Sequence, residues 1–138
     1  MRVILLIMIG LSLLQADFSK TGDIVKDSVS GLEFQDDAVG SRMKWEAAIS
    51  HCEALTLGGY SDWRLPNVNE LKSIADRSKV NPAIVDAFTN TNSYYYWSSS
   101  TFEGSKGYAW FVYFGGGGFV GYGSKDSNYD VMCVRDVQ

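Results

Sequence analysis

Apolar side chains between residues 41 and 57 recur with the period of a helix. The residues at positions i, i+3, i+4, i+7 and i+10 of this repeat are Trp45, Ala48, Ile49, Cys52 and Leu55. They lie on one face of an α-helix, since 3.6 residues complete each turn. Ser41 is the expected N-cap, and Gly58-Gly59 the expected end. The pattern predicts an amphipathic helix with Cys52 on its buried face.

A second helix is predicted over residues 68–77. Asn67 can accept a hydrogen bond from the third helical residue, and the Glu70 side chain can reach back to the cap. The inward-facing residues are Leu71, Ile74 and Ala75. Residues 82–88 predict one further helical turn.

Period-two alternation, which is typical of strands, marks both ends of the chain. The predicted strands cover residues 23–27, 32–35, 94–101, 108–114, 119–124 and 130–137. The four glycines 115–118 are expected to form a hairpin loop, since glycine accepts the positive φ that such loops need. With helices in the middle of the chain and most strands after them, we expect an α+β fold, with two helices packed on a twisted antiparallel sheet.

The segment between the predicted helices has neither a helical nor a strand period. It holds Asp62, Trp63, Arg64, Leu65 and Pro66. Because regular hydrogen bonding cannot hold such a segment, tertiary contacts must do so. We expect Trp63 and Leu65 to pack in the core, and Arg64 and Asp62 to form hydrogen bonds or an ion pair.

Residues 1–16 are predicted to be a secretory signal peptide, which leaves 17–138 as a single domain. A short positive start precedes an apolar run too short for a comfortable membrane span, and Gln15-Ala16 offers a cleavage point. An uncleaved N-terminal anchor is the alternative. After cleavage the protein would be no integral membrane protein, and it is expected to be secreted, periplasmic or on the cell surface.

Export would place Cys52 and Cys133 in an oxidising compartment, where two cysteines have one possible pairing. Two free thiols are the alternative. We expect the disulfide, which would tie the first helix, through Cys52, to the last strand, through Cys133.

The charge balance disfavours several classes of partner. The chain has 12 basic and 16 acidic residues, and without residues 1–16, which hold one Arg and no acid, the net charge is −5. Such a surface disfavours nucleic acid, anionic lipid and a broadly cationic heparin-type site. The net charge does not exclude a local basic patch.

Aromatic residues make up 14% of the chain and are concentrated, with Gly, Ser and Asn, after residue 89. This mixture is typical of recognition surfaces as well as of sheet cores. The candidate ligand-binding residues are Tyr94, Tyr95, Tyr113, Tyr122 and Lys125. Their ring faces would stack on sugars and their polar edges would bond to hydroxyls. The alternative for each of them is that it fills or covers the sheet.

No catalytic residue, metal site or cofactor is predicted, and an enzyme is not expected. His51 is the single His of the chain, and no second ligand or nucleophile is spaced to join it. Asp36-Asp37 lacks the spaced oxygen ligands of a calcium loop, so we expect a solvated loop there.

The long central motif, residues 58–66 followed by Glu70-Leu71, resembles that of the Lcl C-terminal domain family. The other matching segments are 31–36, 45–49, Cys52, 96–100 and 133–135. The resemblance covers about residues 22–137. The family has long been described as a bacterial domain of unknown function, and it is named for the C-terminal domain of a collagen-like adhesin.

The resemblance implies a C-type-lectin-like fold, in which a cysteine of the first helix bonds to the last strand. It also implies a secreted or surface-exposed protein similar to a glycan-binding adhesin. The collagen-like stalk and the calcium-sugar motifs of true C-type lectins are missing, so trimerisation and calcium-dependent binding do not transfer. The leading hypothesis is a module that binds polysaccharide or another surface polymer. The alternative is a protein-interaction or envelope-assembly module, with an envelope or host surface protein as its partner.

Overall fold

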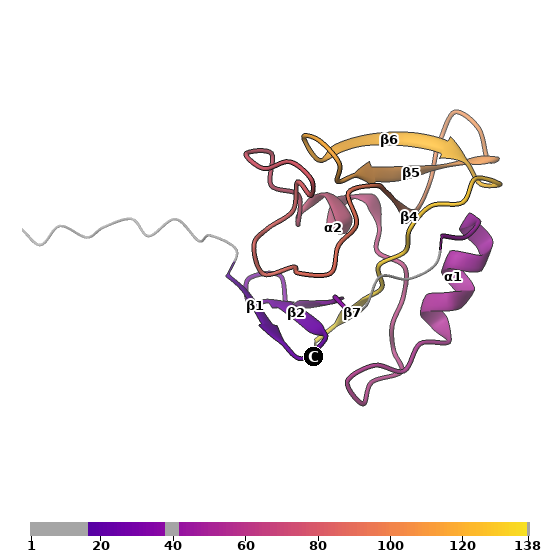
Figure 1. Ribbon diagram of the computed structural model, residues 1–138. Coiled ribbons are helices and arrows are strands. Elements are labelled where there is room, and N and C mark those ends of the chain that lie inside the picture. The colour runs from indigo at the N-terminus through magenta and orange to yellow at the C-terminus, as the bar shows by residue number, and fades with distance from the viewer. Residues whose placement is uncertain (1–16, 38–41, 138) are drawn as a thin grey trace, which may run out of the picture.

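The computed structural model describes residues 17–37 and 42–137, and its strands form two antiparallel sheets (Figure 1). The four-stranded sheet, in the order β1-β2-β3-β7, consists of Phe18–Thr21, Ile24–Asp27, Leu32–Gln35 and Val134–Asp136. The three-stranded sheet, in the order β4-β5-β6, consists of Tyr95–Thr101, Tyr108–Tyr113 and Phe119–Ser124. The helices are α1, Trp45–Glu53, and α2, Val68–Lys72.

The predicted α+β, C-type-lectin-like fold, with two helices on one twisted sheet, is wrong. The described residues are mostly β and form two sheets, and the two helices have only 9 and 5 residues. The last strand pairs with β3 near the start of the chain instead of extending the β4-β5-β6 sheet. Within the described part of the chain, no helix is long and apolar enough to cross a membrane.

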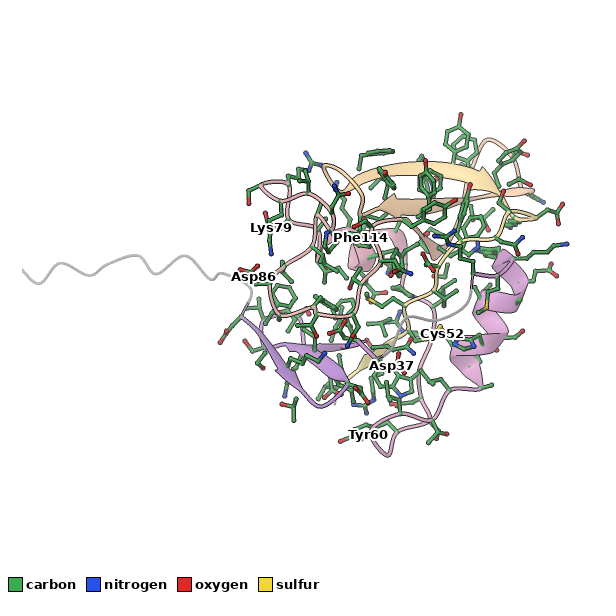
Figure 2. All side chains as sticks on the ribbon, viewed as in Figure 1. Asp37, Cys52, Tyr60, Lys79, Asp86 and Phe114 are labelled. Atoms are coloured by element: carbon green, nitrogen blue, oxygen red, sulfur yellow. A yellow bond between two sulfur atoms is a disulfide. The ribbon has the colours of Figure 1, made fainter. Side chains whose placement is uncertain are left out.

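The predicted disulfide is confirmed and ties α1 to the residue that precedes β7. Cys52 is bonded to Cys133 across 81 residues of sequence, and both are fully buried. Figure 2 labels Cys52 on α1, beside the strand segment that leads to the C-terminus. The helix begins after Lys44, which is its N-cap, while Ser41 lies outside the described residues.

α2 begins with the predicted capping box. The Asn67 side chain accepts the Glu70 N–H at 2.8 Å, and the Glu70 carboxylate accepts the Asn67 N–H at 2.9 Å. The helix is shorter than predicted, because the chain turns so that Ala75 forms a β-bridge with Ile84. The helical turn predicted over residues 82–88 is wrong for the same reason.

The three-stranded sheet carries a hydrophobic cluster on each face, because successive side chains of a strand point to opposite sides. On what we call the inner face, Tyr96, Val112 and Phe114 pack with α2 and with the four-stranded sheet. On the outer face, Trp97 and Phe111 pack with α1, Trp63 and the disulfide. Figure 1 shows α2 between the two sheets and α1 to one side, and Figure 2 shows Phe114 in the interior beside α2.

Candidate functional site

The structure brings together three of the five candidate ligand-binding residues. Tyr94, Tyr95 and Tyr113 lie side by side at one end of the outer face. The ring centroids of Tyr94 and Tyr95 are 4.9 Å apart, and those of Tyr95 and Tyr113 are 4.7 Å apart. Adjacent strands of one sheet therefore place these rings in a single cluster.

The other two candidates lie elsewhere. Tyr122 is on the inner face, because its strand partner is Trp110, and its ring stacks on Phe102 at 4.0 Å. Lys125 follows β6, where its Nζ lies 3.9 Å from the Trp45 ring centroid and donates to the Thr101 hydroxyl. The five residues thus do not form one site.

Two further rings complete the cluster on the outer face. We name it the tyrosine surface, and its members are Tyr94, Tyr95, Tyr113, Phe119 and Tyr129. The Tyr95–Tyr129 centroids are 5.2 Å apart and the Tyr113–Phe119 centroids 5.0 Å, the spacing of favourable tilted aromatic pairs. Phe119 is 49% exposed and the tyrosines are half-buried. The rings hold one another in place and still meet solvent.

The hydroxyls of the tyrosine surface are not used within the described part of the molecule. None of its four tyrosines forms a side-chain hydrogen bond there, and none of their oxygens is buried without a partner. The buried Tyr96 is different, since its hydroxyl accepts the Asn92 N–H at 2.8 Å and burial raises its pKa. The four hydroxyls of the tyrosine surface are therefore at least partly accessible to solvent.

Two glycines of β6 make room for rings of the outer face. A Cβ at Gly123 would lie 2.5 Å from the Tyr129 hydroxyl oxygen, and a Cβ at Gly121 would lie 2.7 Å from the Phe111 ring. Both contacts are closer than side chains tolerate, so only glycine lets the rings lie against the strand.

A charged pair borders the tyrosine surface. The Arg42 guanidinium carbon lies 3.7 Å from the Tyr94 ring centroid, and its Nε lies 3.6 Å from Asp130 Oδ2. The other Asp130 oxygen, Oδ1, accepts from the Asn92 amide at 3.4 Å. Asp130 is only 2% exposed, and this burial raises its pKa although Arg42 opposes the shift. Its Oδ2 has no hydrogen-bond partner among the described residues.

The segment between the helices crosses the core. Trp63 is 2% and Leu65 4% exposed, and the Trp63 indole N–H donates to the Leu57 and Tyr60 carbonyls. Pro66, which follows, is also fully buried. These side chains are packed inside and are not open to a ligand.

Two arginines, Arg64 of the segment itself and Arg135 of β7, hold the segment in place through ion pairs. Arg64 donates to both carboxylate oxygens of Glu70 at 2.7 Å and also to Asp136. Arg135 donates to Asp62 at 2.7 Å and 3.2 Å. Hydrogen bonding to the arginines lowers the pKa of Glu70 and of Asp62.

The interpretation of Asp36 as part of a solvated loop is wrong, because Asp36 is 3% exposed. It forms an ion pair with Lys20 at 2.7 Å and accepts hydrogen bonds from the backbone N–H groups of Thr89 and Asn90.

His51, the single histidine of the chain, is exposed on α1. Within residues 17–37 and 42–137, no group of three or more His, Cys, Asp or Glu side chains is arranged to hold a metal ion.

The sequence reading missed Arg42, Phe119, Tyr129 and Asp130. Tyr129 and Asp130 lie outside the regular strands, and their placement depends on bridges that residue 43 makes with Tyr129 and Tyr96 makes with Asp130. The aromatic content after residue 89 was the one available signal, and it does not tell which rings meet.

Comparison with known families gives a match over most of the chain. A family model described as the Lcl C-terminal domain matches residues 23–135. This range holds both cysteines and the whole tyrosine surface. A search of curated proteins finds no match to the chain.

Proposed function

The chain belongs to the Lcl C-terminal domain family, and from this premise we propose that it is a binding module that recognises polysaccharide through the tyrosine surface. One observation carries the proposal: half-buried ring faces and hydroxyls without partners among the described residues occur together in one place. Ring faces cover the C–H groups of a sugar, and phenol hydroxyls both donate to and accept from sugar hydroxyls.

The border of the tyrosine surface adds polar groups of both kinds. Arg42, whose side chain is half-exposed, supplies donors, and the Asn92 side chain supplies an amide donor and an acceptor, while the buried Asp130 holds both of them in place. Sugar hydroxyls both donate and accept hydrogen bonds. A border that holds donors and acceptors close together therefore favours a polymer of sugars over an apolar protein partner as the ligand.

The proposal includes export and assigns no catalysis to the chain. Export is supported by the Cys52–Cys133 disulfide, since disulfides persist in oxidising compartments.

Affinity electrophoresis tests the proposal. The purified protein is run in native gels that contain dextran, laminarin, xylan or alginate, and at least one of these polymers is expected to retard it. Tyr94→Phe removes one hydroxyl, and it is expected to weaken the retardation about two- to tenfold. Tyr94→Ala removes the whole ring and is expected to weaken the retardation further. Tyr108→Ala is its matched control, because Tyr108 is 41% exposed and lies outside the tyrosine surface.

The proposal fails if no polysaccharide retards the protein, or if Tyr94→Ala migrates as the unchanged protein does in the retarding gel. A pull-down from the native envelope separates the alternative function. One stoichiometric protein partner, in the absence of any retardation, would favour a protein-interaction module.

A further inference from the structure

A hollow lies on the inner face, where α2 meets β5 and β6. Its volume is about 260 Å³, and it is lined by Val68, Asn69, Lys72, Glu103, Trp110 and Val120. We call it the tryptophan hollow. Figure 1 shows α2 directly beneath this sheet. Trp110 and Phe111 point to opposite faces of β5, so the sheet separates the hollow from the tyrosine surface.

Trp110 differs from the other three tryptophans in its hydrogen bonding. The indole N–H groups of Trp45, Trp63 and Trp97 donate to backbone carbonyls at 2.9–3.2 Å. The Trp110 N–H donates to no described residue. Tryptophan is a donor only, and its N–H normally finds an acceptor when it leaves water. This donor is therefore unused among the described residues, and Trp110 itself lines the hollow.

The polar side chains around the hollow are also available. Asn69, Lys72 and Glu103 are exposed, and none of their side chains forms a hydrogen bond or ion pair with another described residue. Together they offer an amide, an ammonium and a carboxylate. The wall thus holds donors and an acceptor that the fold itself does not use.

Neighbouring rings fix the orientation of Trp110. Its ring meets Phe102 edge-to-face at 5.1 Å and Tyr122 at 5.6 Å, and these two rings stack on each other at 4.0 Å. A ring held in this way loses little freedom when a ligand binds. Tyr122, one of the candidate residues from the sequence, thus packs against Trp110 and is not part of the tyrosine surface.

From this arrangement we propose that the tryptophan hollow binds one sugar ring that carries an N-acetyl group. The acetamido oxygen accepts the Trp110 N–H, and the acetamido N–H donates to the Glu103 carboxylate. Val68 and Val120 provide an apolar wall for the acetyl methyl. Asn69 and Lys72 bond to the ring hydroxyls.

The size of the hollow supports a single ring. Pockets for drug-sized ligands enclose roughly 300–1,000 Å³, and the hollow, at about 260 Å³, falls just below this range. A plain hexose would leave the Trp110 donor without the acetamido acceptor. The inference goes beyond the proposed function, and it does not require that the tyrosine surface bind anything.

NMR of the indole N–H groups tests the inference on the intact protein. The signals of the four tryptophans are followed during titration with N,N′,N″-triacetylchitotriose, and the Trp110 signal is identified by its absence in Trp110→Phe. That signal is expected to shift, and cellotriose, which has the same linkage without acetamido groups, is expected to bind at least about tenfold more weakly. Trp110→Phe, followed by backbone signals, is expected to weaken binding about two- to tenfold.

A Trp110 signal that stays in place up to about 10 mM triacetylchitotriose overturns the inference. Equal shifts with cellotriose overturn it as well, because they show that the acetamido group is not recognised. Tyr94→Ala is expected to leave this titration unchanged. If the Trp110 signal shifts while no polysaccharide retards the protein in gels, the proposed function fails and the tryptophan hollow stands.

Discussion

Replacing Arg64 with alanine is expected to destabilise the fold and leave the tyrosine surface intact. The two Nη groups of Arg64 donate to the two oxygens of Glu70 at 2.7 Å, which is the strongest geometry for an arginine–carboxylate pair. The side chains are 36% and 15% exposed, so solvent screens the pair only in part. The second partner, Asp136, is 62% exposed and contributes little.

The expected loss in the free energy of unfolding is about 2 kcal/mol at pH 7. A hydrogen bond to a charged group contributes roughly 1.5–3 kcal/mol, and the exposure of Arg64 places this pair toward the lower end. Because Glu70 also caps α2, Glu70→Ala removes the capping hydrogen bond as well as the ion pair with Arg64, and it is expected to cost more stability than Arg64→Ala. A double-mutant cycle of Arg64→Ala and Glu70→Ala isolates a coupling energy of about 1 kcal/mol.

The coupling energy is expected to depend on pH through Glu70. The hydrogen bond from Arg64 lowers the pKa of Glu70 below its ordinary value of 4.5. A carboxyl whose pKa is lowered by folding stabilises the protein fully above its ordinary pKa, and this stabilisation is lost as the pH falls through the folded-state value. The coupling should therefore be present at pH 7 and disappear in acid.

Urea unfolding, monitored by tryptophan fluorescence at pH 7 and below the lowered pKa of Glu70, measures the four variants of the cycle. Affinity electrophoresis of Arg64→Ala checks that polysaccharide binding is unchanged. The reasoning is refuted if Arg64→Ala changes stability by less than about 0.5 kcal/mol, the range of ordinary surface substitutions. A coupling energy that is the same at both pH values also refutes it.

Three further predictions address the disulfide, the glycines of β6 and the buried carboxylate. Cys52→Ala/Cys133→Ala is expected to lower the free energy of unfolding by about 4–5 kcal/mol, because the bond closes a loop of 81 residues; urea unfolding measures this. Gly123→Ala is expected to displace Tyr129, to cost about 1–3 kcal/mol and to weaken retardation in polysaccharide gels, whereas unchanged migration would contradict the packing described. Asp130→Asn is expected to raise stability by about 1 kcal/mol at pH 7, since burial raises the pKa of Asp130 and its ionised form is disfavoured. The gain should vanish below the ordinary pKa of 3.8, and a gain that persists in acid would contradict this cause.

The amino-acid sequence determined those features that depend on neighbours in the chain. The helical period placed Cys52 on the buried face of α1, and Asn67 and Glu70 formed the capping box that starts α2. The four glycines 115–118 joined β5 and β6 as an antiparallel hairpin. The disulfide followed from having two cysteines and one possible pairing. Each of these rests on local geometry or on elimination, so no knowledge of the fold was needed.

The tertiary structure decided which strands pair and which rings meet. Period-two alternation marks a strand but not its partner, and so β7 joins β3 in a second sheet that the sequence did not predict. The register of the β5–β6 hairpin places Tyr122 opposite Trp110, and a slip by one residue would have turned it to the face of Tyr113. Tyr129 reaches the tyrosine surface through the bridge to Met43, a contact between residues far apart in the chain. Pairing and register depend on contacts between distant residues, and the side chains that form a binding surface therefore become known only once the chain is folded.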